Sequence, residues 1–393
     1  TSRLADAGAR VVKVEREDSG GDFARYYDKF AGNEMSSYFV WLNRGKESVQ
    51  LDLRREEDAS LVKNLIGKAD VFVQNLKPSS ADRLGFGSET LREEFPRLIT
   101  VDISGYGTSS EKFKGKKAYD LLVQAESGLC NVSGVGGEAT RVGVSVCDIA
   151  CGMYAHAAVL EAIMTQRETG QGTCIDVSLF SSVADWMTVP LLHYESDGTF
   201  SYIDIYISHS TNENNNNQQH TGKGPKATGL AHPSISPYGA YNTSKDTRVL
   251  ISIQNEKEFV SLCEHVLRRP EIPMDPRFDS NVSRCQSRDE VDRTLENIFL
   301  KLGHEETLKR LDEANIAYAE VNDMKGLSEH DALSRQSVKT EIGPISLIAP
   351  PVRFDGQHRT YGAVPSLGQH NTSIRDEFGS SRRSMARQYS SSS

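Results

Sequence analysis

The sequence lacks an excess of positive charge, a clustered set of cysteines, and any apolar run that approaches the length needed to cross a bilayer. Its formal net charge is −9, which argues against wholesale binding of nucleic acid. Six cysteines are scattered along the chain, and the pair Cys147 and Cys151 has no second pair nearby that would complete a zinc site. These absences predict no metal, no membrane partner and no nucleic-acid partner. They also predict free, buried thiols in a reducing compartment, and hence an intracellular protein of the cytoplasm or the mitochondrial matrix.

The chain does contain enough material for two substantial cores. It has 393 residues, of which 37% are hydrophobic and 25% are charged, as in soluble globular proteins. Strands are expected over residues 10–15, 48–52, 70–74 and 98–103, with helices over residues 56–68 and 80–94. This alternation predicts an α/β fold with a doubly wound, largely parallel sheet. Such a domain normally begins with a strand, whereas this chain begins partway through a helix, so we expect the sheet to lack its first strand.

The remaining segments divide the chain further. A buried helix over residues 142–165 and a strand over residues 173–178 complete a large domain of residues 1–195. Residues 196–229 are rich in Asn, Gln and Gly and predict a low-complexity crossover that cannot bury a core. The divisions expected after it are a smaller α+β domain over residues 230–320, a return to the large domain over 321–379, and a Ser-rich, disordered tail over 380–393.

Asp148 is the most informative single residue. It lies in a run of small and apolar residues, 143–153, where a lone carboxylate is costly to desolvate. Such an acid either caps a helix or acts as a covalent nucleophile, and on its own the capping interpretation is favoured. A second apolar, helix-like segment begins upstream at Tyr119.

Several short stretches follow one another along nearly the whole chain: LADAGA at 4–9, VVKVER at 11–16, WLNRGK at 41–46, LDL at 51–53, VFVQN at 71–75, ISGYG at 103–107, Tyr119-Asp120, Asp148, AHPSI at 231–235 and PSLGQH at 365–370. In this order they resemble the class III CoA-transferases, the family of formyl-CoA transferase and carnitine CoA-transferase. The resemblance implies a Rossmann-like large domain and an interlocked homodimer. It also implies acyl-CoA and a small carboxylic acid as substrates, with a coenzyme A thioester consumed as substrate and no tightly bound cofactor.

The resemblance makes Asp148 the nucleophile. Its carboxylate would attack an acyl-CoA thioester to give a mixed anhydride and free CoA thiolate. The thiolate would then return to the aspartyl carbonyl, releasing the donor acid and leaving an aspartyl-CoA thioester that the acceptor acid attacks in turn. Partial burial would strip the water that weakens a carboxylate nucleophile.

The resemblance also implies a CoA-binding surface. Arg16 and Arg83 match contacts to phosphate, and Lys116 and Lys117 lie where the family has a basic CoA contact. A solvated surface charge is the alternative for each of these. Tyr119 would line the CoA channel. The segments that match the adenine end contain Leu51, Leu53, Asn75 and Lys77.

Two other functions stay open. α-Methylacyl-CoA racemases also resemble the chain but carry a histidine at the position of Tyr119, and a phenol is a poor base at neutral pH, so transfer is favoured. An inactive, truncated CoA-binding paralogue is the second alternative. His232 could be catalytic, although a His-Pro pair before a strand is more often a turn. The family carries a glycine-rich flap over the active site, whereas this chain has no glycine-rich run, and residues 214–219 and 222–229 occupy comparable territory. The 231–238 and 367–370 stretches are closest to members that act on small dicarboxylates, such as succinyl-CoA:glutarate transferase.

Overall fold

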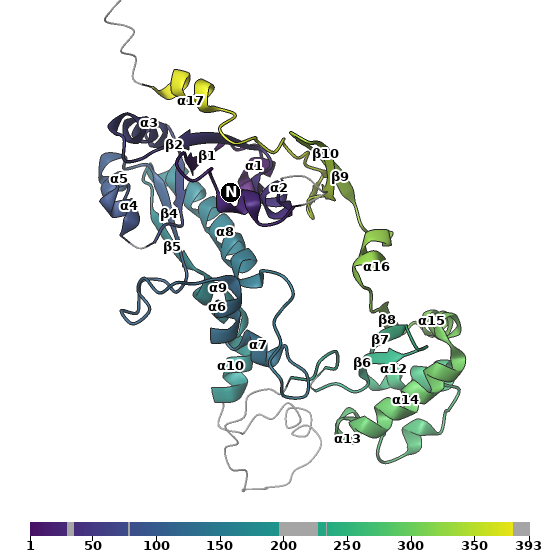
Figure 1. Ribbon diagram of the computed structural model, residues 1–393. Helices are drawn as coiled ribbons and strands as arrows, with labels where there is room; N and C mark the ends of the chain where they lie inside the picture. The colour runs from purple at the N-terminus through teal and green to yellow at the C-terminus, as the bar shows by residue number, and fades with distance from the viewer. Residues whose placement is uncertain (30–34, 78, 196–226, 233, 380–393) are drawn as a thin grey trace, which may run out of the picture. The chain divides into compact units, whose positions relative to one another are not determined.

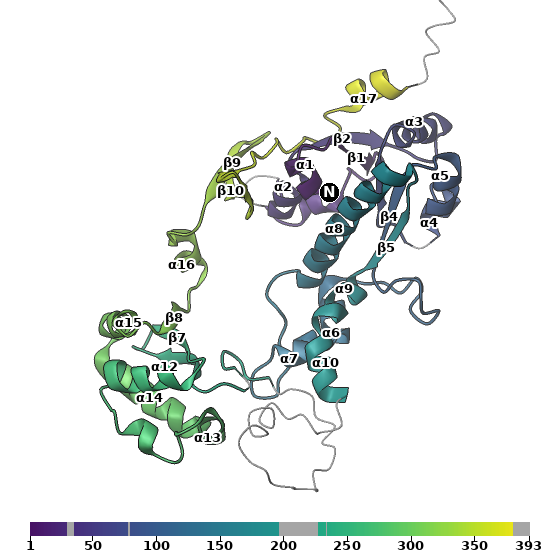
Figure 2. The ribbon, with the colours of Figure 1, turned by 180° about the vertical axis from the view of Figure 1, so that it is seen from behind.

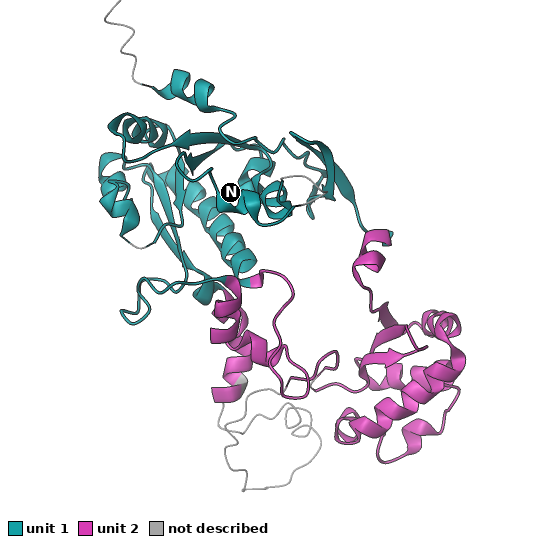
Figure 3. Cartoon of the chain, in the orientation of Figure 1, with its two compact units in different colours: residues 1–119, 147–182, 330–393 teal, residues 120–146, 183–329 magenta. Residues whose placement is uncertain are grey.

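The structure is a computed structural model that describes residues 1–29, 35–77, 79–195, 227–232 and 234–379. The chain forms two compact units (Figure 3). Unit 1 comprises residues 1–119, 147–182 and 330–393, and unit 2 comprises residues 120–146 and 183–329.

The borders of these units differ from the expected domains. Residues 120–146 and 183–195 group with unit 2 instead of the large domain, as do residues 321–329. One reason is a β-bridge between Val135 and Thr228, which ties the first of these segments to unit 2. The expected crossover, apart from residues 227–229, and the expected tail lie outside the described residues.

Unit 1 contains two parallel sheets. Strand β1 (Val11–Arg16) pairs with β2 (Lys46–Leu51), and β3 (Val71–Gln74), β4 (Ile99–Ser104) and β5 (Cys174–Ser178) form a three-stranded sheet in that order. All five expected strands therefore form and are parallel, but in two sheets instead of one continuous sheet. Both sheets contribute to one core, because Phe72 of β3 packs against the cluster that contains Val49 and Leu51 of β2.

Helices cover the sheets of unit 1. They are α1 (Ser2–Asp6), the 3-10 turn η1 (Phe23–Tyr26), α2 (Ser37–Asn43), α3 (Glu56–Ile66), α4 (Ser80–Arg83), α5 (Ser88–Glu94), α8 (Val146–Thr169) and α17 (Asn371–Phe378). The single helix expected over residues 80–94 is two helices, because the chain turns at Gly85 with a φ of +78°. Two short antiparallel pairs, β9 (Arg335–Thr340) with β10 (Gly343–Ile348) and β11 (Arg353–Phe354) with β12 (Gln357–His358), complete the unit.

Helix α8 lies against the three-stranded sheet, as Figures 1 and 2 show from opposite sides. Ala155, Val159 and Ala162 pack with Ile99 and Val101. The expectation that no apolar run reaches membrane-spanning length was wrong, because the 24 residues of α8 satisfy that criterion by length and composition. Core helices satisfy the same criterion, and the sheet-facing side of α8 is core.

Unit 2 contains an antiparallel sheet in the order β6 (Tyr238–Asn242), β7 (Arg248–Ser252) and β8 (Ala317–Glu320). Helix α9 (Leu179–Trp186) crosses the border between the two units. The helices that lie wholly in unit 2 are α6 (Asp120–Glu126), α7 (Leu129–Val132), α10 (Thr188–Glu195), α12 (Glu256–Ser261), the π turn η2 (Leu262–Val266), the 3-10 turn η3 (Ile272–Met274), α13 (Asn281–Gln286), α14 (Arg288–Leu302), α15 (His304–Glu313) and α16 (Met324–Glu329). The buried side chains of Ile251, Leu295 and Phe299 belong to the core between this sheet and its helices.

Candidate active site

Asp148 is the third residue of α8 and therefore lies inside the first turn of that helix. A carboxylate in the first turn interacts favourably with the helix dipole. Its side chain is exposed, whereas Cys147, Ala150 and Cys151 beside it are buried. The expected partial burial of Asp148 was wrong for this chain, because the first turn of α8 buries a different face. The carboxylate is thus accessible to a substrate.

Cys151, one turn along α8 from Asp148, does not compete as a nucleophile. Burial raises the pKa of the Cys151 thiol to about 11, with the charge of Asp148 adding to the increase and a hydrogen bond with Ser182 opposing it. A thiol with so high a pKa stays protonated at neutral pH. Four of the six cysteines are buried and form no disulfide, as expected, but Cys174 is exposed and Cys285 is half-buried.

Tyr27 lies close enough to Asp148 for the charge of that carboxylate to affect the pKa of its phenol. Partial desolvation raises the pKa of Tyr27, and the charges of Tyr119 and Asp148 raise it further. The Tyr27 ring contacts Tyr38 edge-on at a centroid distance of 5.5 Å and Phe23 at 5.2 Å. All of these rings are exposed. Unit 1 therefore places the phenol of Tyr27 near the candidate nucleophile, and Tyr27 in turn contacts two further aromatic side chains.

Sequence reasoning missed Tyr27, Tyr38 and Phe23. A pair of tyrosines at 26–27, soon after the strand that ends at Arg16, was the available signal, but nothing in the sequence indicates that these rings approach Asp148, 121 residues later. Lys116, by contrast, was predicted, and its ammonium lies 4.9 Å from the ring centroids of both Tyr106 and Phe113. These cation–π contacts hold its side chain. Lys117 is exposed.

Arg16 ends β1, and its side chain is 73% exposed. Its Nε and Nη2 donate to Asp18 Oδ1 and Oδ2 at 3.0 and 2.8 Å, and this contact raises the pKa of Arg16 and lowers that of Asp18. Arg54 Nη2 donates to the same Asp18 Oδ2 at 2.9 Å and also contacts Asp52. We call Arg16, Asp18, Asp52 and Arg54 the outer network. It brings two guanidinium groups to one carboxylate, although Arg54 was not predicted.

Leu51 pairs in register with Arg16, but its side chain is 1% exposed and lies in the core. Leu53 is half-buried against the same core. The expected contact of Leu51 with the adenine end was therefore wrong, because the whole residue is buried in the core. Its carbonyl also accepts from the backbone N–H of Glu17 at 3.3 Å.

Asn75, Lys77 and Arg83 are exposed and lie in one segment that follows the carboxyl end of β3. Gln74 fixes the start of this segment, because its Nε2 donates to Asp102 Oδ1 at 2.7 Å and its Oε1 accepts from the backbone N–H of Leu76 at 2.7 Å. Arg83 Nη2 donates to Ser80 Oγ at 3.0 Å within α4. The carboxyl ends of parallel strands are where ligands commonly bind in α/β folds.

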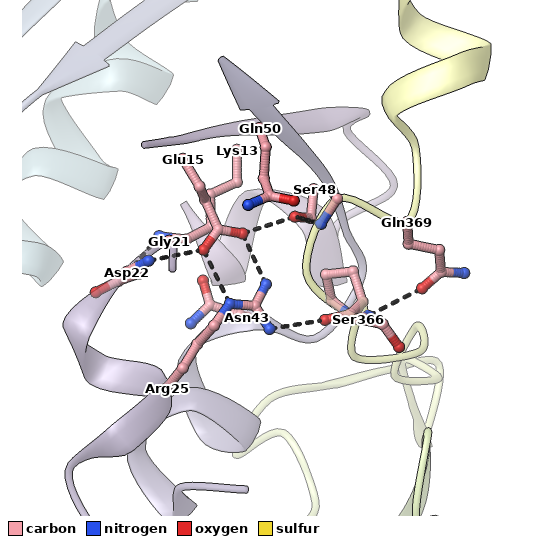
Figure 4. Close-up of polar contacts among 12 residues, drawn as sticks. Lys13, Glu15, Gly21, Asp22, Arg25, Asn43, Ser48, Gln50, Ser366 and Gln369 are labelled. Atoms are coloured by element: carbon pink, nitrogen blue, oxygen red, sulfur yellow. Dashed lines mark hydrogen bonds and ion pairs between the residues drawn. The ribbon is translucent and has the colours of Figure 1, made fainter. Parts of the chain in front are cut away.

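A buried polar cluster lies on the other side of β1 (Figure 4). Glu15, 3% exposed, accepts hydrogen bonds from Arg25 Nε at 2.9 Å, Arg25 Nη2 at 2.7 Å, Ser48 Oγ at 2.7 Å and the backbone N–H of Asp22 at 3.0 Å. Burial alone would raise the pKa of Glu15, but these hydrogen bonds outweigh it and hold the pKa below its ordinary value. We call Glu15, Arg25 and Ser48, with the groups that they bind, the inner network.

His232 belongs to a turn of unit 2. Its backbone N–H donates to Tyr238 O at 2.9 Å, its ring stacks on Tyr238 at 5.1 Å, and its Nδ1 accepts from the backbone N–H of Ser234 at 3.2 Å. These contacts favour the turn interpretation over a catalytic one. Among the residues that the structure describes, no three His, Cys, Asp or Glu side chains are arranged to hold a metal ion.

The sequence and fold of this chain are similar to those of known proteins. The family described as CoA-transferase family III matches residues 1–371. Acetyl-CoA:oxalate CoA-transferase of Acetobacter aceti is 30% identical over 96% of this chain and 91% of its own length, and succinyl-CoA:glutarate CoA-transferase of Homo sapiens is 29% identical over 96% and 82%. A CaiB/BaiF family protein from Brucella suis is 27% identical, covers 96% of this chain and 94% of its own, and superposes with a TM-score of 0.77. With a family match over nearly its whole length, the chain belongs to CoA-transferase family III.

Proposed function

We propose that this protein moves CoA from an acyl-CoA donor such as succinyl-CoA to a small dicarboxylic acid, and that Asp148 is the covalent nucleophile. The observation that carries the proposal is the exposed carboxylate in the first turn of α8, with the protonated thiol of Cys151 one turn along the helix and the phenol of Tyr27 nearby. Succinyl-CoA and glutarate appear in the name of a relative, which supports the choice of substrates.

The chemistry needs no group beyond the carboxylate and the two substrates. An oxygen of Asp148 attacks the thioester carbonyl, the C–S bond breaks, and CoA leaves as the thiolate. The thiolate then attacks the aspartyl carbonyl of the anhydride, and cleavage of the C–O bond releases the donor carboxylate. The acceptor carboxylate repeats these steps in reverse and restores Asp148.

The phenol of Tyr27 is suited to stabilise these steps, and Tyr119 would line the CoA channel. Each addition to a carbonyl places negative charge on an oxygen, which hydrogen-bond donors stabilise. The pKa of Tyr27 is raised, so its hydroxyl keeps its proton at neutral pH and stays a donor. Bound acyl-CoA would cover the exposed carboxylate and exclude water from it.

The CoA phosphates would bind guanidinium and ammonium groups at the strand ends. Arg16 and Arg83 are the proposed phosphate contacts, with Lys116 and Lys117 as further cations. Asn75 and Lys77 would contact the adenine end together with the half-buried residues 52 and 53. The exposure of all six side chains supports this assignment. Arg suits phosphate because its planar fork can donate two parallel hydrogen bonds.

Two further proposals concern architecture. We propose that the two parallel sheets of unit 1 are parts of one doubly wound, Rossmann-like arrangement, because Val49 of β2 and Phe72 of β3 pack in the same core cluster. We also propose a homodimer, because α9 and α10 expose Trp186, Leu191 and Leu192 at 50%, 50% and 57%. Size-exclusion chromatography with light scattering would measure the oligomer. The compartment stays a prediction.

The experiment that tests the function compares the wild-type chain with Asp148→Asn. The amide keeps the shape and removes the nucleophile, so transfer of CoA from succinyl-CoA to glutarate should fall by several orders of magnitude while CoA binding persists. Unchanged transfer in Asp148→Asn would refute the mechanism. Incorporation of deuterium from solvent α to the thioester, without CoA transfer, would instead favour the racemase.

A further inference from the structure

The loop over residues 17–27 connects two parts of the proposed site. It begins after Arg16, the proposed phosphate contact, and ends at Tyr27, which lies close to Asp148. The contacts that fix this loop therefore determine the positions of the Arg16 and Tyr27 side chains. The contacts of Arg25, inside the loop, identify that support.

Arg25 is buried, with 8% of its surface exposed. Two of its guanidinium nitrogens donate to the two carboxylate oxygens of Glu15, at 2.9 and 2.7 Å, and Nη1 donates to the backbone carbonyl of Pro365 at 3.3 Å. The guanidinium carbon also lies 3.8 Å from the ring centroid of Phe39. One side chain thus joins the loop to β1, to α2 and to the segment that follows residue 364 (Figure 4).

The partners of Arg25 are themselves fixed. Glu15 also accepts from Ser48 Oγ of β2 at 2.7 Å, and Ser48 Oγ accepts from the backbone N–H of Gly368 at 2.9 Å. The loop backbone closes tightly over the pair at Gly21, whose φ is +89°. A Cβ there would lie 2.5 Å from Leu367 Cδ1 and 2.8 Å from Glu15 Oε2, so a side chain at this position would displace Leu367 and Glu15 as well as strain the backbone.

We propose that Arg25, acting through Glu15, is a positioning residue for the transfer reaction. It holds the loop so that Arg16 meets the CoA phosphates while Tyr27 stands beside Asp148. The inference rests on the proposed function, since it concerns the same site. Arg25 itself is buried and touches neither substrate.

The test measures kcat and KM for succinyl-CoA, CoA binding by calorimetry, and thermal unfolding. Arg25→Ala should lower kcat/KM by about 100-fold, the scale expected when reacting groups are displaced by about 1 Å. Because Arg25→Ala leaves Glu15 buried and unpaired, the double variant Arg25→Ala with Glu15→Gln is measured as well, since it removes the buried charge and preserves folding. This double variant should also lose activity below its melting temperature.

Restoring activity to Arg25→Ala with a small guanidinium compound distinguishes a role of Arg25 in positioning the site from a role in stabilising the fold alone. Guanidinium chloride or methylguanidine at concentrations far below those that denature proteins should restore part of the activity of Arg25→Ala, because the small cation can occupy the vacated position beside Glu15. The matched control is Arg10→Ala, which removes a guanidinium bound to Glu47 and Glu377 on the surface of the same unit. Arg10→Ala should keep the wild-type kcat/KM and show no response to guanidinium.

The outcomes distinguish the two proposals. If Asp148→Asn is inactive but both Arg25 variants, folded at the assay temperature, turn over normally, the positioning role is wrong and the function stands. If guanidinium fails to restore any activity to Arg25→Ala, the positioning role is also overturned. If Asp148→Asn transfers CoA normally, the proposed function itself fails.

Discussion

The inner and outer networks are built from the same kinds of charge at neighbouring positions of one strand, yet they differ in burial. Successive residues of a strand point to opposite sides, so Glu15 faces the interior of unit 1 and Arg16 faces solvent. Glu15 and Arg25 are 3% and 8% exposed, whereas the side chains of Arg16 and Arg54 are 73% and 66% exposed. A buried pair cannot exchange its partner for water or a ligand without a large cost, whereas an exposed pair can. The inner network is therefore suited to hold the fold, and the outer network to bind phosphate.

The largest effect should come from breaking the inner network. Glu15→Ala leaves the Arg25 guanidinium buried without its carboxylate and should lower the free energy of unfolding by about 3–5 kcal/mol. The measurement is urea unfolding followed by circular dichroism. Asp18→Asn, the matched change in the outer network, should leave the unfolding midpoint unchanged. Equal effects of the two variants would contradict the distinction between the networks.

Lys46, next to the inner network, should give unfolding a pH dependence of its own. Burial, assisted by the charge of Lys13, lowers the pKa of Lys46 from its ordinary 10.5 to about 7. Between these pH values the unfolded chain binds a proton at Lys46 that the folded chain does not, so stability should rise with pH, by at most about 1.4 kcal/mol per pH unit.

Urea unfolding between pH 7 and pH 9 measures how the free energy of unfolding changes with pH. The contribution of Lys46 is the difference in this slope between the wild type and Lys46→Met. The variant should lack that part of the slope, because methionine fills similar space without titrating. Parallel pH profiles for the two proteins would show that the Lys46 ammonium is not desolvated.

The outer network should affect ligand binding more than stability. Arg16→Ala removes a guanidinium that is proposed to contact CoA phosphate, and the dissociation constant for succinyl-CoA should rise by at least about 10-fold. Arg83→Ala should behave similarly. Calorimetry with succinyl-CoA and acetyl-CoA checks that the loss is the same for both acyl groups. A loss that depends strongly on the acyl group would remove these residues from the phosphate site.

The smallest effect should come from Asp18. Its carboxylate accepts hydrogen bonds from Arg16 and Arg54, and an incoming phosphate would have to displace it from them. Asp18→Asn should therefore tighten CoA binding by a few-fold, with the gain shrinking as salt is added, because salt screens the exposed charges. Weaker binding in Asp18→Asn would mean that Asp18 orients Arg16 for the ligand instead of competing with it.

The expected strands and the helix expected over residues 56–68 were confirmed because their residues carry local patterns: β-branched runs for strands, and a 3.6-residue repeat over Glu56–Ile66. The division between α4 and α5 depends on a positive φ at Gly85. A single glycine within a helical pattern does not predict such a φ. Contacts between segments that are distant in the sequence could not be predicted from local sequence patterns. Arg25 donates to the backbone carbonyl of Pro365, 340 positions later in the sequence. Tyr27 approaches Asp148 only through tertiary structure.

The identity of the nucleophile is the claim on which the account depends, and trapping the covalent intermediate tests it most directly. The full chain would be mixed with succinyl-CoA without an acceptor, quenched in acid, digested and analysed by mass spectrometry. The account predicts CoA or succinate attached to the peptide that contains Asp148, and no adduct in Asp148→Asn. An adduct on any other residue, or active transfer by Asp148→Asn, would contradict it.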